Sequence, residues 1–229
     1  MVLDGCGPQA PTQNLGTSTK TQKPISTRDT GRLGEICKTV VEDARKHKDN
    51  PKPFLTLSDL KARFIDGHND IRARYNLSPL AWDDDMARYA QAWADHLKAH
   101  NQCKMQHRSH VGREDGKKYG ENLAWNWTNK SIASNQFAQT PEFAVFGWSK
   151  ECKDYSFVDA SCKPHKKCGH FTQMVWQSSQ KFGCGMAVCE KAVTEHGVGR
   201  AEVWVCNYDP AGNVYQVDAS GNKTPLKPF

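Results

Sequence analysis

The sequence has no run of 18 apolar residues among its 229, so no membrane-spanning helix is expected. Charge of one sign is also scarce, because 31 basic residues against 25 acidic ones leave a net charge of only +6. That value falls short of the footprint of a nucleic-acid-binding protein. The signatures G-x-S-x-G, H-E-x-x-H, G-x-x-x-x-G-K-[ST] and G-x-G-x-x-G are absent. Their absence argues against a serine hydrolase, a zincin, a nucleotide binder and a dehydrogenase.

Aromatic residues are missing from the first 31 positions, which are rich in Thr, Gln, Pro, Gly and Ser. Such a segment buries too little apolar surface to offset the entropy of ordering, so it is expected to be a polar tail. The helical spacing of Leu33, Val40 and Ala44 predicts a short amphipathic helix over 32–48, followed by a Pro-rich linker at 50–53. We therefore expect an N-terminal extension, 1–57, and one domain with a short C-terminal tail, 58–229.

The nine cysteines, by contrast, are numerous, and six of them follow residue 150. No C-x-x-C pair occurs, so disulfides in an oxidising compartment are favoured over structural zinc. An odd count leaves at least one thiol free or paired between chains. No apolar segment typical of a signal peptide follows Met1. Either the chain is a mature form with an added Met, or it is not exported.

Hydrophobic periodicity predicts three further helices and a strand pair. The first helix runs from Ser58, as N-cap, to about Tyr75. The second begins after three aspartates at 83–85, whose charge suits a helix N-terminus, and the third opens at Pro141 and runs to about Tyr155. Apolar runs at 182–189 and 201–208 predict two antiparallel strands, while 101–120 and 156–167 are expected to be loops. This alternation of helices and strands predicts an α/β layered fold.

Five motifs occur in a fixed order: HNDIR at 68–72, PLAWD at 79–83, GENLAW at 120–125, CGHFTQMVW at 168–176 and VCNYDPAGN at 205–213. Together they resemble the CAP superfamily, which contains cysteine-rich secretory proteins, venom allergen 5 proteins and plant pathogenesis-related protein 1. The resemblance covers about residues 58–213. It implies a three-layer α–β–α sandwich with a small antiparallel sheet, to which the N-terminal extension is added.

The resemblance also implies an open cleft that holds two His and two Glu. The positions that match are His107, Glu121, Glu151 and His170, with His110 as a rival to His107. Imidazoles bind divalent metals through neutral nitrogens, so a weakly bound Zn²⁺ or another divalent ion is expected there. The alternative is a buried polar network that only ties loops to the sandwich. His68 matches a position that the family uses structurally.

The implied function is that of a secreted protein that binds a fatty acid or a sterol and acts in host or environment interaction. A groove between the first and third predicted helices of the domain is expected to hold the lipid against Phe64, Ile71, Val145 and Trp148. In the loop that follows, Tyr155 and Phe157 match part of an aromatic pattern that some members use for sterols. The first alternative is a module that binds a protein receptor without lipid. A metal-assisted hydrolase is less favoured, and we expect no enzyme.

By resemblance to the plant members, Cys103 is expected to pair with Cys189, Cys162 with Cys168, and Cys184 with Cys206. Of the three remaining cysteines, Cys37 and Cys152 both lie on predicted helices while Cys6 lies in the tail, so a Cys37–Cys152 bond is expected. The tripeptides at 126–128 and 129–131 are sequons for N-glycosylation in a loop that we expect at the surface.

Overall fold

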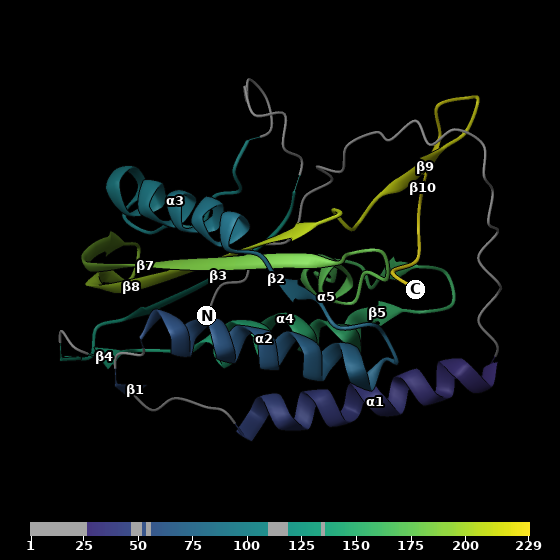
Figure 1. Cartoon of the computed structure of the whole chain (residues 1–229), viewed down its shortest axis with the longest axis horizontal. Helices are drawn as coiled ribbons and strands as arrows, with labels where there is room; N and C mark the ends of the chain where they lie inside the picture. Colours follow the sequence, from purple (N-terminus) through teal and green to yellow (C-terminus); the bar gives the residue numbers. More distant parts are fainter. Residues whose placement is uncertain (1–26, 47–51, 54–55, 110–118, 134–135) are drawn as a thin grey trace.

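The protein forms an α–β–α sandwich around a four-stranded sheet (Figure 1). The computed structural model describes residues 27–46, 52–53, 56–109, 119–133 and 136–229. Helix α3 (Asp84–Asn101) covers one face of the sheet, and α2 (Leu57–Arg74) and α4 (Pro141–Ser149) cover the other. Helix α1 (Thr27–Lys46) lies outside α2 and α4, and the short α5 (Gly169–Met174) lies near one end of the sheet. The predicted fold class is confirmed.

The sheet has the strand order β2-β7-β8-β3. Its long strands β3 (Gly120–Thr128), β7 (Lys181–Thr194) and β8 (Gly197–Asp209) are antiparallel, and the short β2 (Ala81–Trp82) joins β7 in parallel. Successive side chains of a strand point to opposite faces. On β8, accordingly, Val203 and Val205 pack toward α3, whereas Trp204 and Tyr208 pack toward α2 and α4. The sheet thus separates two hydrophobic cores.

Local sequence explains where the two central helices begin. Helix α2 starts with a capping box, in which Thr56 accepts from the Asp59 amide and the Asp59 carboxylate accepts from the Thr56 amide. The N-cap is therefore Thr56 and not Ser58. Asp83 is the N-cap of α3, and its carboxylate accepts a hydrogen bond from the Met86 amide. The acidic start that the sequence predicted for this helix is present. Helix α3 can approach β7 closely because a Cβ at Gly185 would stand 2.5 Å from the Gln91 Cα.

Several predicted loops form regular structure instead. Helix α1 begins at Thr27, so the end of the predicted polar tail is helical. In the predicted linker, β1 (Lys52–Pro53) pairs with β4 (Gln136–Phe137). The predicted third helix is α4 followed by a 3-10 turn, η1 (Lys150–Asp154), and β5 (Tyr155–Ser156) pairs with β6 (Ser161–Cys162) inside a predicted loop.

The first sequon and the C-terminal tail also differ from expectation. Asn126 belongs to strand β3 and is only partly exposed, whereas Asn129 of the second sequon is exposed. Near the C-terminus, β9 (Tyr215–Val217) and β10 (Lys223–Pro225) form a hairpin. The terminal Phe229 ring lies 5.7 Å from the Tyr75 ring, so the tail ends against the core rather than in solvent.

Four disulfides cross-link the described residues. They are Cys37–Cys152, Cys103–Cys189, Cys162–Cys168 and Cys184–Cys206. All four predicted pairs are confirmed, and Cys6 lies outside the described residues. Within the described part of the chain, no helix has the length and apolar character needed to span a bilayer.

Candidate functional site: two histidine–carboxylate pairs beside the sheet

The first pair joins the loop after α3 to strand β3. His107 follows Cys103 by four residues, and the Cys103–Cys189 disulfide fixes the start of that loop against β7. The His107 Nδ1 and the Glu121 Oε1 are 2.8 Å apart, and the Arg108 amide donates to the same oxygen at 3.0 Å. The Asn207 side-chain amide donates to the other Glu121 oxygen at 3.4 Å. His107 thus lies beside Glu121, and its rival His110 lies outside the described residues.

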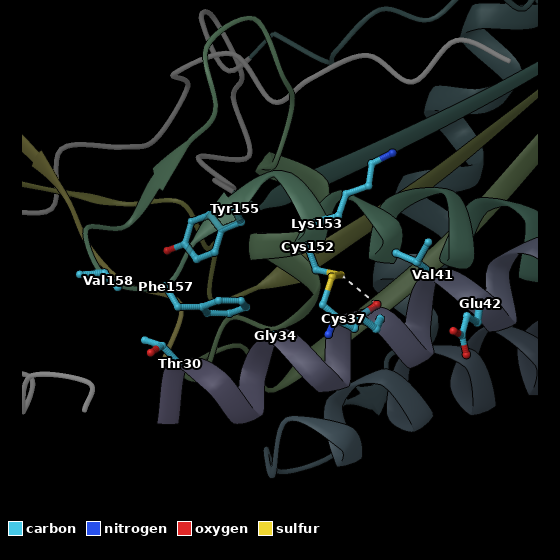
Figure 2. Close-up of a pocket in the computed structure, with 11 residues that line it drawn as sticks. Thr30, Gly34, Cys37, Val41, Glu42, Cys152, Lys153, Tyr155, Phe157 and Val158 are labelled. Atoms are coloured by element: carbon cyan, nitrogen blue, oxygen red, sulfur yellow. Dashed lines mark hydrogen bonds between the residues drawn. A yellow bond between two sulfur atoms is a disulfide. The ribbon is translucent and has the colours of Figure 1, made fainter. Parts of the chain in front are cut away.

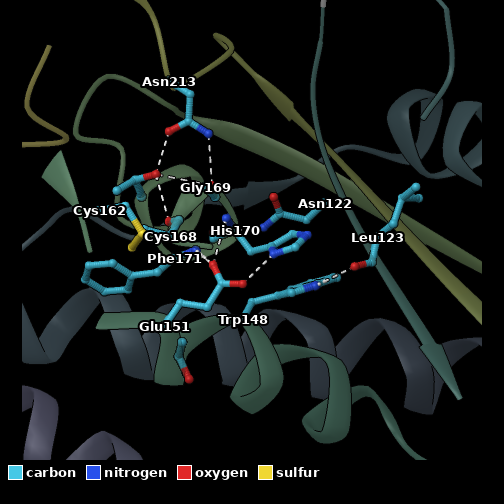
Figure 3. A network of polar contacts seen from close by, with 12 residues as sticks. Asn122, Leu123, Trp148, Glu151, Cys162, Cys168, Gly169, His170, Phe171 and Asn213 are labelled. Carbon is cyan, nitrogen blue, oxygen red and sulfur yellow. Dashed lines mark hydrogen bonds and ion pairs between the residues drawn. A yellow bond between two sulfur atoms is a disulfide. The ribbon is translucent and has the colours of Figure 1, made fainter. Parts of the chain in front are cut away.

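The second pair joins η1 to α5 (Figure 3). The His170 Nδ1 lies 2.7 Å from the Glu151 Oε1, while the backbone amides of His170 and Phe171 donate to the Glu151 Oε2 at 3.1 and 3.2 Å. Glu151 therefore accepts at both oxygens, which offsets the cost of burying its charge. The Trp148 indole stacks near the His170 ring at 6.2 Å and donates to the Leu123 carbonyl. The predicted helical spacing between Trp148 and Glu151 brings both residues to His170.

In each pair the second imidazole nitrogen is buried without a partner. The Nε2 atoms of His107 and His170 make no hydrogen bond. A carboxylate that accepts from Nδ1–H fixes the tautomer and leaves the Nε2 lone pair for a metal, as in carboxylate–histidine–metal arrangements. Each of the two rings therefore keeps one nitrogen with the chemistry of a metal ligand. However, the described residues contain no group of three or more His, Cys, Asp or Glu arranged to hold a metal ion. An ion bound here would take its remaining ligands from water.

Two asparagines connect the pairs to the core, and the sequence motifs contained both without indicating their role. The Asn122 amide donates to the His170 carbonyl at 3.0 Å and to the Tyr208 hydroxyl at 3.3 Å. Asn207 contacts the Gly120 carbonyl as well as Glu121, and its Oδ1 is buried without a partner. Their positions inside the GEN and CNY motifs were the only available signal. The polar network expected as the alternative is thus present, and it also leaves three orphaned polar atoms.

His68 has the structural role that was expected. Its Nδ1 donates to the Phe64 carbonyl at 2.8 Å, and its Nε2 accepts from the Tyr208 hydroxyl at 2.8 Å. Both ring nitrogens are occupied and the side chain is fully buried. Burial in this apolar environment lowers the pKa of His68 to about 4, with a smaller contribution from the positive charge of Arg72. The ring is neutral at physiological pH.

The four residues expected to contact lipid lie in the core shared by α2 and α4. Phe64, Ile71, Val145 and Trp148 are at most 2% exposed. An acyl chain would reach them only if the two helices separated. Their role in lipid binding stays a prediction.

A cavity of about 510 Å³ lies elsewhere, between α1 and the segment 152–158 (Figure 2). Val41, Tyr155, Phe157 and Val158 supply apolar surface, and the Cys37–Cys152 disulfide is part of the wall. Lys38, Glu42 and Lys153 are among its polar residues. Burial raises the pKa of Tyr155, so its hydroxyl is uncharged at neutral pH. The sequence indicated Tyr155 and Phe157, but not that α1 would line an open pocket beside them.

Comparisons with known proteins show the family of this chain. Residues 65–208 match the family described as the cysteine-rich secretory protein family, or CAP, and the chain belongs to this family. Pathogenesis-related protein 1C of Nicotiana tabacum is 37% identical over 66% of this chain and 75% of its own length. Pathogenesis-related protein PR-1 of Medicago truncatula is 34% identical over 72% of this chain and 82% of its own.

Longer proteins also match. Peptidase inhibitor 16 of Mus musculus is 34% identical over 77% of this chain, but the match spans only 33% of the mouse protein. Among solved structures, MpPR-1i has 24% identity and a TM-score of 0.47, and it is matched over 73% of this chain and 96% of its own.

Proposed function

We propose that this chain is an extracellular CAP protein that binds a fatty acid or another amphiphilic lipid without catalysing a reaction. The cavity between α1 and the segment 152–158 is the observation that carries the proposal. Its volume lies within the range of about 300–1,000 Å³ that is typical of small-molecule sites. Four disulfides support an extracellular location, because such bonds persist in oxidising compartments.

The chemistry of the cavity wall suits an amphiphile. Phe157 is mostly buried, and its ring packs edge-on against the Tyr155 ring at 5.1 Å, which provides a firm apolar surface. Val158, in contrast, is 65% exposed at the cavity, so a bound lipid would gain free energy by covering its apolar surface. Lys153 supplies an ammonium group that a fatty-acid carboxylate would attract. This site requires no separation of α2 from α4.

We expect affinity to rise with acyl-chain length, because each buried CH₂ contributes about 0.8 kcal/mol. A displacement assay with a fluorescent fatty acid, run with and without a chelator, measures this. Val158→Asp is expected to weaken binding by placing a charge against the chain. Val193→Asp is the matched control, since Val193 is also exposed, at 52%, but does not line the cavity. The His107→Ala/His170→Ala variant is expected to bind lipid as the unmodified protein does.

Three outcomes would contradict the proposal. Absence of saturable binding would favour the alternative of a module that binds a protein receptor. If Val158→Asp and Val193→Asp weakened lipid binding equally, the lipid would have to bind outside this cavity. If a substitution of Val145 lowered the affinity for lipid while Val158→Asp had no effect, the predicted groove between α2 and α4 would be favoured.

A second proposal is that His107 and His170 bind a divalent ion, Zn²⁺ first among them. Its support is the pair of buried Nε2 atoms without partners, each on a ring oriented by a carboxylate. When bound, zinc would act as a Lewis acid. Glu121 and Glu151 would hold the protons on Nδ1 and keep the rings in place.

Zinc calorimetry on the unmodified protein and on His107→Ala/His170→Ala tests this site. The variant is expected to lose the binding heat, and affinity is expected to fall on acidification because a protonated imidazole cannot ligate a metal. Glu151→Gln is a milder probe: it keeps a hydrogen-bond acceptor for His170 but removes the charge that favours a cation. Equal zinc binding by all three proteins would place the ion elsewhere.

A further inference from the structure

The exposed side of α3 carries a row of rings that the proposed sites do not use. Tyr89, Trp93, His96 and His100 recur at intervals of four, three and four residues, which places them on one helix face. The Trp93 and His96 rings stack at 4.6 Å with an angle of 10°, and the His96 and His100 rings are 4.7 Å apart. Both histidines are exposed to solvent.

The stack orients the first histidine of this row. The Trp93 indole nitrogen donates to the Gln106 carbonyl at 2.8 Å, and the Arg108 guanidinium lies 5.8 Å from the Trp93 ring. Trp93 is thus held from two sides, and it covers one flat face of the His96 ring. A metal ion approaches an imidazole in the ring plane, along a nitrogen lone pair. The stack therefore restricts the ring without blocking its nitrogens.

The nitrogens of both rings are available. Within the described residues, neither His96 nor His100 makes a hydrogen bond or an ion pair through a ring nitrogen. With metal–nitrogen bonds of about 2.0–2.1 Å, two imidazoles on one ion at roughly 90–110° have centroids about 4.5–5.2 Å apart. The 4.7 Å separation lies in this range. Two histidines four residues apart on one helix face are also a known arrangement for zinc ligands.

We propose that His96 and His100 form a surface site for a divalent transition metal that prefers imidazole, with Cu²⁺ bound more tightly than Zn²⁺. The preference follows the general order of affinities for such ligands. No third His, Cys, Asp or Glu joins the pair in the described residues, so water completes the coordination and the ion remains exchangeable. The site shares no residue with the His107–Glu121 and His170–Glu151 pairs.

The test is a Cu²⁺ titration of the full chain at pH 7.5, followed by electron paramagnetic resonance and by tryptophan fluorescence. Even the loss of an outer partner of a metal ligand costs about 10–100-fold in affinity, so His96→Ala or His100→Ala is expected to weaken binding at least tenfold. The resonance spectrum is expected to report two coordinated imidazoles in the unmodified protein. Trp93→Phe retains a ring in the stack and is expected to keep the spectrum while the fluorescence quenching decreases.

A matched control keeps the number of histidines constant. Lys98→His/His100→Ala moves one imidazole to a spacing of two residues, which faces another side of the helix. This variant is expected to bind Cu²⁺ as weakly as His100→Ala does. The His107→Ala/His170→Ala variant is expected to retain Cu²⁺ binding at His96 and His100. Equal affinity in the unmodified protein and in the spacing variant would overturn the proposal, as would loss of the tight site in the His107→Ala/His170→Ala background alone.

Discussion

His68 makes the stability of the protein dependent on pH. Because burial lowers its pKa from 6.5 to about 4, the folded protein binds fewer protons at this site than the unfolded chain does between these values. Its contribution to stability is therefore fully present above pH 6.5 and is lost as the pH falls toward 4. A difference of this size corresponds to at most about 3 kcal/mol in the free energy of unfolding.

Urea unfolding between pH 7.5 and 4.5 measures this effect. His68→Gln is expected to be less stable at pH 7.5 but to show a shallower loss of stability on acidification, because the side chain no longer titrates. His165→Gln replaces an exposed histidine and is expected to leave the pH profile unchanged. A profile for His68→Gln as steep as that of the unmodified protein would assign the acid sensitivity to other groups.

At the scale of single residues, the sequence predicted some contacts of the polar side chains and missed others. The family resemblance implied His107, Glu121, Glu151 and His170 as one set, and the structure groups them into two pairs. The contact of His68 with Tyr208 spans 140 residues, and no local pattern encodes it. The hydrogen bonds that Glu151 accepts from α5 could not be predicted either. They come from backbone amides, which every residue except proline has, so no residue type marks them in the sequence.

Among the elements, those with a clear hydrophobic period were the ones predicted. Helix α3 and the strands β7 and β8 appear where the pattern placed them, with bounds shifted by a few residues. Strand β3 was missed because its residues 121–125 are buried on both faces, so no alternation marks it. The six residues of α5 are too few to display a helical period. The missed elements carry Glu121 and His170, so the motifs located the site better than periodicity did.

At the scale of the whole molecule, the N-terminal extension and the CAP domain share one core. Leu33, Cys37 and Val40 of α1 are buried in the same cluster as Phe64 and Trp148. The Cys37–Cys152 bond links α1 to η1 across 115 residues. The proposed division at residue 57 stays a prediction, but this shared core implies that α1 unfolds together with the domain. It also makes α1 a wall of the proposed lipid cavity.

Replacing Cys37 and Cys152 with Ala is expected to lower the free energy of unfolding by about 2–4 kcal/mol, because the bond closes a long loop in the unfolded chain. The matched control is Cys162→Ala/Cys168→Ala, whose bond spans only six residues and is expected to contribute less. Without its tether, α1 keeps its apolar contacts and the Asp43–Arg74 ion pair, which is partly exposed to solvent, so limited proteolysis is expected to release it before the domain unfolds. Affinity for a long-chain fatty acid is expected to fall in parallel, since the cavity loses one wall. If α1 were cleaved no faster in the Cys37→Ala/Cys152→Ala variant than in the control, the remaining contacts would suffice to hold it, and the disulfide would not be what keeps α1 beside the cavity.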